Sequence, residues 1–261
     1  MKILVSIPTY NEKDNIGRMI DSVLKINYTE TVKNCGASVD LLIIDDNSPD
    51  GTRQIVKEYQ NRYGHNMPCR THGLLSLTPM LFLIEREKKL GLGTAYIAAF
   101  NFAVGKGYDY VLTMDCDFSH NPEEIAGFVS LMENERCGMI VGSRYSGGIR
   151  IINWSMKRLL ISYFANIYAK FVTGVKISDL TGGFNMYDVN CLKKINLNGV
   201  SSRGYAFQVE MKYRVAKEAG CGFKEYPIIF YERTMGKSKM SNGIIFEAFF
   251  GVIKLRLGLY K

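Results

Sequence analysis

The sequence predicts an α/β fold in which a doubly wound, mostly parallel sheet is flanked by helices. Short β-rich apolar runs alternate with segments of helical periodicity, a pattern typical of parallel strands joined by crossover helices. The apolar runs end abruptly in polar segments that read as loops. The chain has 261 residues, 47% of them hydrophobic and 22% charged, so one large domain with a substantial core is within reach.

Five strands are expected in the N-terminal half. The first covers residues 3–7, where Pro8 stops it, and apolar residues then recur at helical spacing from 16 to 24. A helix over about 52–63 follows the second strand, and an Ala-rich helix over about 95–104 follows the third. Because the carboxyl ends of parallel strands lie at one edge of a sheet, the loops there are expected to bind a ligand. The other four strands are expected at residues 41–44, 81–84, 111–114 and 138–142.

The C-terminal half is less regular. Residues 151–172 predict a long helix in which aromatic and aliphatic side chains are interleaved with basic ones. This helix either packs on the core or rests at a membrane interface. A polar turn at 177–184 precedes another short strand, and a helix is expected from 204 to about 219. The last strand, 223–231, is expected at an edge of the sheet because Pro227 interrupts it.

Two further segments have no clear place in this pattern. Residues 64–80 have no period and are interpreted as an insertion or a long connection. The tail, residues 243–260, is strongly apolar but is interrupted by Glu247, Lys254 and Arg256. It is too short to span a bilayer, so an amphipathic helix on lipid or on a partner is expected. The N-terminal run has no signal-peptide pattern, and no transmembrane span is predicted.

Charge and cysteine usage limit the classes of function. The formal net charge of +8 favours an anionic partner, such as a nucleotide, a nucleic acid or an acidic membrane surface. Nucleic acid is the least favoured, because the basic residues lie in separate loops and form no known module. The six cysteines are scattered without a CxxC pair, which argues against a zinc module and predicts reduced thiols in a cytosolic environment.

Two carboxylates one residue apart follow the strand at 111–114. At a strand end Asp115 and Asp117 can point the same way. Such close like charges favour a divalent cation between them, and Mg²⁺ or Mn²⁺ would accept oxygen ligands and also bind phosphates. The alternative is a pair of solvated loop aspartates. Cys116 between them is a soft ligand and is expected to pack.

A glycine-containing loop follows the third strand. Gly91 and Gly93 lack the third glycine of a dinucleotide-binding motif and are separated from the strand by a charged loop. We therefore interpret this segment as a basic loop directed at an anionic ligand.

Eight short motifs are spread in order over residues 3–241. They are Pro8-Thr9-Tyr10-Asn11-Glu12, Asp45-Asp46-Asn47-Ser48-Pro49-Asp50-Gly51-Thr52, Leu90-Gly91-Leu92-Gly93-Thr94-Ala95-Tyr96, Met114-Asp115-Cys116-Asp117-Phe118-Ser119-His120-Asn121-Pro122, Gly142-Ser143-Arg144-Tyr145, Asp179-Leu180-Thr181-Gly182-Gly183-Phe184, Gly204-Tyr205-x-Phe207-Gln208-x-Glu210 and Arg233-x-x-Gly236-x-Ser238-Lys239. The set resembles the GT-A glycosyltransferases of family 2, and the last four motifs are similar to those of its dolichol-phosphate (polyprenyl-phosphate) mannosyltransferases. Cys116 replaces a small residue of that family, and the insertion near 64–80 has no counterpart in it.

The resemblance implies a function and a location. The function is the metal-dependent, inverting transfer of mannose from GDP-mannose to dolichyl (polyprenyl) phosphate, which gives dolichyl β-D-mannosyl phosphate and GDP. It implies Mg²⁺ or Mn²⁺ as cofactor and peripheral attachment at the cytoplasmic face of a membrane, the endoplasmic reticulum in a eukaryote, alone or through small membrane partner subunits. It also implies a GT-A catalytic domain over residues 1–240, with an interface helix at 151–175, and an amphipathic tail over 241–261.

Individual residues receive roles from the same resemblance. Asp115 and Asp117 would bind the metal, with Ser119 as a further ligand, and which carboxylate binds it directly stays open. The GDP-mannose site would comprise Pro8, Tyr10, Glu12, Asp45, Asp46, Arg86, Lys89, Gly91, Asp115, Cys116, Asp117, Arg233 and Lys239. The catalytic residues would be Asp117, Arg144, Arg158, Asp179, Arg233 and Lys239, with Arg144 and Arg158 binding the acceptor phosphate and Asp179 orienting the sugar or an arginine.

Two other functions stay open. One is a related transferase that uses UDP-glucose with a polyprenyl phosphate, or that acts on a soluble acceptor. The other is a nucleotide-binding subunit without catalysis that recruits a partner through its apolar tail.

Overall fold

The computed structural model describes residues 1–66, 79–200, 202, 204–232 and 250–259 of the chain. Most of the predicted insertion, the two basic residues Arg233 and Lys239 and the first part of the apolar tail therefore lie outside the described residues.

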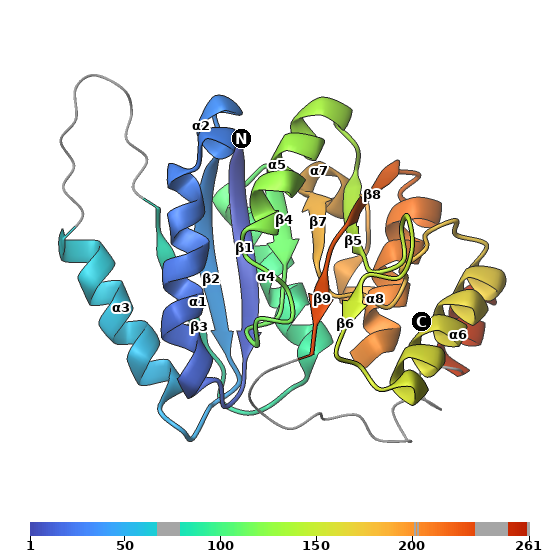
Figure 1. Cartoon of the computed structure of the whole chain (residues 1–261), viewed down its shortest axis with the longest axis horizontal. Coiled ribbons are helices and arrows are strands. Elements are labelled where there is room, and N and C mark those ends of the chain that lie inside the picture. The colour runs from blue at the N-terminus through green and yellow to red at the C-terminus, as the bar shows by residue number, and fades with distance from the viewer. Residues whose placement is uncertain (67–78, 201, 203, 233–249, 260–261) are drawn as a thin grey trace.

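Seven strands form the central sheet, in the order β3-β2-β1-β4-β7-β5-β8 (Figure 1). Six of them run parallel, and β7 is antiparallel to both of its neighbours. The predicted doubly wound, mostly parallel fold is thus confirmed. The strands are β1 Lys2–Thr9, β2 Ser38–Asp45, β3 Leu81–Glu85, β4 Tyr110–Thr113, β5 Met139–Ser143, β7 Asn185–Asp188 and β8 Phe223–Pro227.

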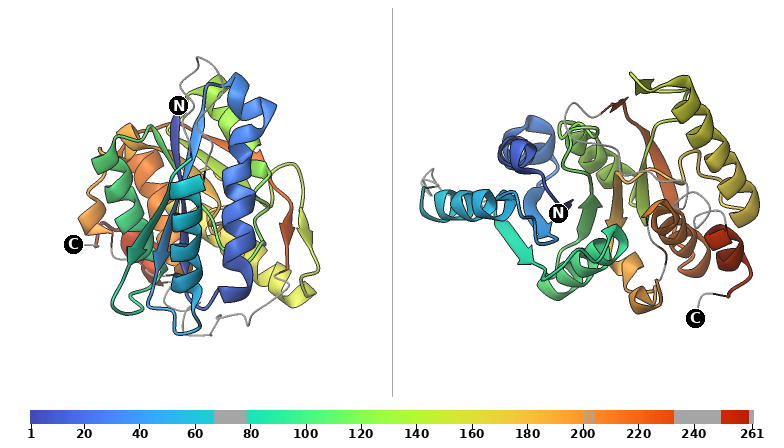
Figure 2. Two further views of the ribbon diagram at one scale, coloured as in Figure 1. Left: turned by 90° about the vertical axis from the view of Figure 1, so that its left-hand side faces the viewer. Right: turned by 90° about the horizontal axis from the view of Figure 1, so that it is seen from below.

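Helices cover both faces of this sheet (Figure 2). Their apolar side chains meet alternate residues of the strands, since successive strand residues point to opposite faces. The helices are α1 Lys13–Lys25, α2 Glu30–Asn34, α3 Thr52–Asn66, α4 Leu92–Lys106, α5 Glu124–Glu135, α6 Met156–Thr173, α7 Val189–Leu192 and α8 Gly204–Tyr213, with short 3₁₀ turns at Ile26–Tyr28 and Leu197–Gly199 and a π-helical turn at Arg214–Glu218. Neither α2 nor α5 is among the predicted helices.

One face of the sheet is covered by α1, α3 and α5. In α1 the apolar residues fall three or four apart, which places them on one stripe against the strands, and Ile16, Ile20 and Val23 are fully buried there. The other face is covered by α4, α7 and α8, together with Ala169 of α6 and Val252 of the helical residues 250–256. The core therefore has two halves separated by the sheet.

The predicted last strand is divided in two. β8 ends at Pro227 and lies at the edge of the sheet, as predicted. The chain then turns away, and β9, Phe230–Tyr231, pairs with β6, Ile151–Ile152, in a separate two-stranded sheet. A single continuous strand was the wrong prediction because Pro227 lacks the backbone N–H that would extend the ladder.

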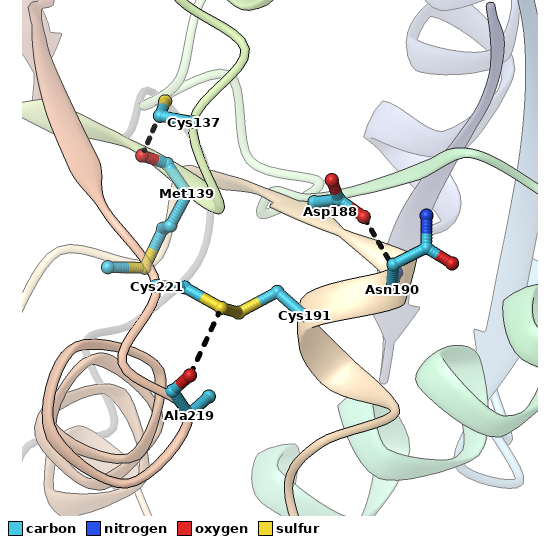
Figure 3. The surroundings of a disulfide bond; sticks show 7 residues. All are labelled: Cys137, Met139, Asp188, Asn190, Cys191, Ala219 and Cys221. Carbon is cyan, nitrogen blue, oxygen red and sulfur yellow. Dashed lines mark hydrogen bonds between the residues drawn. A yellow bond between two sulfur atoms is a disulfide. The ribbon is translucent and has the colours of Figure 1, made fainter.

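The predicted reduced state of all six cysteines is wrong for two of them. Cys191 of α7 and Cys221, just before β8, form a disulfide between residues 30 positions apart (Figure 3). Cys35, Cys116 and Cys137 are free thiols. Periodicity and motif spacing contain no information on this pair, which is joined only because β7 and β8 flank β5 in the sheet.

The helix α6 packs on the core, as one of the two roles considered for it requires, and also has exposed apolar residues. Ser155 caps its N-terminus by accepting a hydrogen bond from the Arg158 N–H, and Gly174 ends it in the left-handed conformation. One face packs inward through Asn166 and Ala169, whereas Phe171 is 87% exposed. Among the described residues, no helix combines the length and the apolar character needed to cross a membrane.

Candidate active site

The loop after β4 brings its two carboxylates to one cavity. Asp115 and Asp117 both line this cavity, which has a volume of about 530 Å³. Asp117 is buried, and its Oδ1 accepts a hydrogen bond of 3.1 Å from the Ser119 N–H. Asp115 has a side chain that is 43% exposed. Cys116 points instead into the core, where burial raises the pKa of its thiol, so that it packs as predicted.

His120 supports this loop from beneath. Its Nδ1 accepts a hydrogen bond of 3.1 Å from the Asp115 N–H, and its ring stacks on Phe184 with 4.9 Å between ring centres. Burial lowers the pKa of His120 to about 4, so the imidazole is neutral at physiological pH. Because Nδ1 is the acceptor, the proton of the neutral ring lies on Nε2.

The donor set suits a hard cation that brings ligands of its own. No cluster of three or more His, Cys, Asp or Glu side chains able to hold a metal occurs within the described ranges. A Mg²⁺-type ion, however, is often held by only one or two carboxylates, with phosphates and water as the remaining ligands. Two carboxylates at the wall of an open cavity fit that pattern.

The ends of β1, β2 and β3 gather the residues predicted for the nucleoside. The strand register places Thr9 opposite Asp45 and Asp45 opposite Glu85, so the polar ends of the strands are level. Asp45 is fully buried, and its oxygens accept hydrogen bonds from Thr9 and Ser48. Asp45 also forms an ion pair with Arg53, with 3.3 Å between Oδ2 and Nη2. Asp45 therefore holds the two loops together.

Beside Asp45, four of the predicted residues form two pairs. An ion pair of 2.9 Å joins Asp46 to Arg86, and burial raises the pKa of Asp46. The ammonium group of Lys89 lies 4.1 Å from the ring centre of Tyr10. Glu12 accepts a hydrogen bond of 3.0 Å from the Asn15 amide. The edge thus presents an aromatic ring and several charged groups next to the Gly91 turn, where the backbone φ is +95°.

Arg144, directly after β5, is locked by Asp179. Its Nε and Nη2 donate to the two Asp179 oxygens at 2.6 and 2.7 Å, and its backbone N–H donates to Oδ2 at 3.0 Å. Burial by itself would raise the pKa of Asp179, but the adjacent guanidinium and the hydrogen bonds lower it to about 2. Nη2 also donates to the Thr181 hydroxyl at 2.8 Å, while Nη1 makes no hydrogen bond within the described part of the chain. Of the two roles predicted for Asp179, its contacts match the one in which it orients an arginine, namely Arg144.

The second predicted phosphate-binding arginine lines the same cavity. Arg158 forms an ion pair with Glu232, and its guanidinium lies 4.0 Å from the centre of the Trp154 ring. Arg144 lies 5.6 Å from that ring. The cavity is therefore lined by two guanidinium groups that both lie close to the Trp154 ring. Its remaining wall is largely apolar and comes mainly from α6, through Leu160, Ile161, Phe164, Ala165, Tyr168 and Ala169.

One short segment joins the parts of the site. Residues 228–232, here called the connecting segment, donate backbone hydrogen bonds to Ser143 at 3.1 Å and to Ser119 at 3.3 Å. Two more bonds go to Arg150 and Ile152 around β6. The carboxylate loop and the Arg144 loop are thus tied to the same piece of backbone.

Three contributors are absent from the predicted site. His120 and Thr181 belong to the quoted motifs, but the motifs alone do not say which side chains face inward. Lys212 of α8 is fully buried beneath the loop that carries Asp179, and burial lowers its pKa to about 7. No sequence signal marks it, because seven consecutive α8 residues, 206–212, are buried.

A parallel sheet that presents paired carboxylates and a cavity at its carboxyl edge defines a GT-A-like enzyme fold, and comparisons with known proteins give the family. The family model described as glycosyl transferase family 2 matches residues 4–195. The chain therefore belongs to glycosyl transferase family 2 and is a glycosyltransferase.

Two curated relatives match almost the whole chain. The polyprenol monophosphomannose synthase of Mycolicibacterium smegmatis is 36% identical over 251 residues, which cover 96% of this chain and 85% of the relative. The undecaprenyl-phosphate mannosyltransferase of Micrococcus luteus is 34% identical over 258 residues, which cover 97% of this chain and 93% of the relative.

Solved structures share the fold at low identity. Glucosyl-3-phosphoglycerate synthase from Mycobacterium tuberculosis, in complex with Mn²⁺, UDP and glucosyl-3-phosphoglycerate, superposes with a TM-score of 0.62 at 14% identity, over 98% of this chain and 80% of that one. TarS from S. aureus, in complex with UDP-GlcNAc, gives a TM-score of 0.61 at 18% identity. That superposition covers 98% of this chain and 65% of the TarS chain.

Proposed function

We propose that the chain transfers mannose from GDP-mannose to a polyprenyl phosphate such as dolichyl phosphate, giving GDP and a β-linked mannosyl lipid phosphate. The observation that carries this proposal is the single cavity that joins Asp115 and Asp117 to Arg144 and Arg158 and that has an apolar wall. The names of the two curated relatives support the sugar and the class of lipid acceptor.

The donor is proposed to lie across the carboxyl ends of β1 to β4. Its base and ribose would contact the group around Tyr10 and Asp46, with the diphosphate next to Asp115 and Asp117. When bound there, Mg²⁺ or Mn²⁺ stabilises the negative charge that develops on the departing diphosphate. These two carboxylates would hold the ion, and the Ser119 hydroxyl is a further candidate ligand in the same loop.

The acceptor phosphate is proposed to bind Arg144 and Arg158. With Nε and Nη2 of Arg144 occupied by Asp179 and Thr181, Nη1 is the nitrogen available to a phosphate oxygen. Guanidinium groups suit this task because they bind phosphate with fixed geometry. A lipid phosphate is ionised at neutral pH, so the site has to place its oxygen behind the anomeric carbon and needs no strong general base. Attack from that side inverts the anomeric centre.

The lipid chain is proposed to leave the cavity along α6. Leu160, Phe164 and Tyr168 line the cavity, and Phe164 is also 60% exposed on the outer surface. The exposed apolar residues of α6 continue to Phe171 and would rest in the interfacial region of a membrane. The exposed apolar residues of α6 support the proposed peripheral attachment to a membrane, and the cytoplasmic face stays a prediction. Partner subunits and the roles of Arg233 and Lys239 stay predictions.

Sugar transfer tests the proposal directly. The purified chain is incubated with GDP-mannose or UDP-glucose, a short polyprenyl phosphate and Mn²⁺ or Mg²⁺, and the lipid product is extracted and identified. Mannosyl lipid phosphate formed only with GDP-mannose, and lost with EDTA, is the expected result. Preference for UDP-glucose or for a soluble sugar acceptor would replace the proposed substrates, and transfer that Asp117→Asn leaves unchanged would contradict the proposed site.

A further inference from the structure

A buried lysine lies directly beneath the loop that carries Asp179. The Nζ of Lys212, on α8, donates hydrogen bonds to the Leu180 carbonyl at 3.2 Å and to the Gly182 carbonyl at 2.7 Å. Its side chain is fully buried. An ammonium group without solvent is costly unless it is well bonded, so this lysine is expected to have a specific role.

The loop that it holds is built around Asp179. Residues 179–183, here called the Asp179 turn, close on themselves through a 2.9 Å bond from the Gly182 N–H to Asp179 Oδ1. Three of these residues, Thr181, Gly182 and Gly183, line the cavity. The position of the turn therefore sets both the wall of the cavity and the carboxylate that orients Arg144.

The Asp179 turn is held from two sides. On the α6 side, the Asn166 side chain accepts hydrogen bonds from the N–H groups of Leu180 at 2.7 Å and Thr181 at 3.1 Å. On the α8 side, Lys212 takes the carbonyls of Leu180 and Gly182. Asn166 thus uses the donors of the turn, and Lys212 uses its acceptors.

The buried carboxylate of Asp179 interacts electrostatically with both Arg144 and Lys212. Other titratable groups that interact electrostatically with this cluster are Glu225 of β8, the neutral His120, Tyr145 and Tyr205. Removal of the ammonium group would leave the buried Leu180 carbonyl without its donor and the Gly182 carbonyl with the Asn185 amide alone. It would also remove a group that helps to keep Asp179 ionised.

We infer that Lys212 is a positioning residue for the acceptor phosphate. It fixes the Asp179 turn and thereby the guanidinium of Arg144. The inference rests on the proposed function in one respect, namely that Arg144 binds the acceptor.

The variant Lys212→Met removes the charge and keeps the length of the side chain. We expect the KM for polyprenyl phosphate to rise about tenfold, while the KM for GDP-mannose stays within about twofold. Amide hydrogen exchange of the Asp179 turn should become faster in the same variant, and this readout does not depend on turnover. If Lys212→Met does not fold, Lys212→Gln, whose amide keeps donor atoms without the charge, is taken through the same measurements.

Arg214→Met is the matched control. Arg214 is also a buried basic residue in this helical segment, but its hydrogen bonds go to Glu210, Glu218 and the Gly199 carbonyl. It should lower the thermal stability without a selective rise in the acceptor KM. An acceptor KM within twofold of wild type at Lys212→Met, or an equal rise at Arg214→Met, would overturn the inference. Absence of mannosyl transfer by the wild type would refute the proposed function instead. Unchanged hydrogen exchange of the Asp179 turn at Lys212→Met would even then overturn the inference that Lys212 fixes the turn.

Discussion

The pair formed by Arg144 and Asp179 allows a quantitative test. Asp179→Asn preserves the shape of the side chain but removes the charge. The amide NH₂ group would replace one acceptor oxygen and face a guanidinium N–H, which is also a donor. Asp179 is fully buried and accepts three hydrogen bonds from Arg144 alone. Its pKa of about 2, against an ordinary 3.8, corresponds to about 2.5 kcal/mol at about 1.36 kcal/mol per pH unit. Breaking a buried ion pair by removal of one partner typically costs about 3 to 5 kcal/mol.

We therefore expect Asp179→Asn to lower the free energy of unfolding by about 3 kcal/mol. Urea unfolding followed by circular dichroism measures this, and Asp14→Asn, at an exposed position in α1, should change it by less than about 0.5 kcal/mol. The sign of the pH dependence follows from a folded-state pKa below the unfolded one: the contribution is complete above about pH 4 and is lost as the pH falls through about 2. Asp179→Asn should remove this acid-sensitive part of the stability.

The double variant Asp179→Asn with Arg144→Met completes a cycle. Because the two groups share one buried ion pair, the double variant should lose less than the sum of the two single losses, by about 2 kcal/mol or more. Additive losses, within about 0.5 kcal/mol, would refute the argument that Asp179 acts through Arg144.

Three other predictions follow from the site and its support. Asp117→Asn should lower mannosyl transfer at least about 100-fold and should abolish the enhancement of GDP binding by Mn²⁺ in isothermal titration calorimetry, as EDTA does for wild type; undiminished metal-dependent binding would contradict the assigned ligand. Gly142→Ala places a Cβ 2.7 Å from the Phe184 carbonyl oxygen and 2.9 Å from the Phe128 ring, so it should cost about 1 to 3 kcal/mol of unfolding free energy, whereas Gly105→Ala in α4, with open space around it, should be neutral or stabilising. Phe164→Ser with Phe171→Ser should lower binding to anionic liposomes at least about tenfold in a flotation assay, and Tyr28→Ser, an exposed aromatic outside α6, should not; equal binding of all variants would rule out α6 as the contact.

The sequence predicts the parts of this molecule that depend on local pattern. Apolar runs followed by polar loops are enough to predict β1 to β5, because each of these strands is marked by a pattern of only a few consecutive residues. Asp115, Asp117 and Arg144 could be placed in one site because their motifs follow strands whose ends share an edge, whereas Arg158 was assigned to it by the family resemblance alone.

Features that depend on contacts between distant segments are not predictable in this way. The insertion of β7 between β4 and β5, in the opposite direction, is set by the path of the chain after α6. The disulfide of Cys191 with Cys221 depends on that path too. The sequence does not distinguish Lys212 from any other helical lysine, because its hydrogen-bond partners belong to the distant Asp179 turn. Likewise, Arg158 pairs with Glu232, which lies 74 positions further along the chain.

The connecting segment ties the two proposed substrate sites to one piece of backbone. Because it donates backbone hydrogen bonds to Ser119 on one side and to Ser143 on the other, a shift of the loop proposed to bind the metal would also act on the loop that carries Arg144. Thermodynamic linkage then requires reciprocity: whatever factor the sugar nucleotide applies to the affinity for the lipid, the lipid applies to the affinity for the sugar nucleotide. The dissociation constant of either substrate, measured with and without the other, would give this single factor.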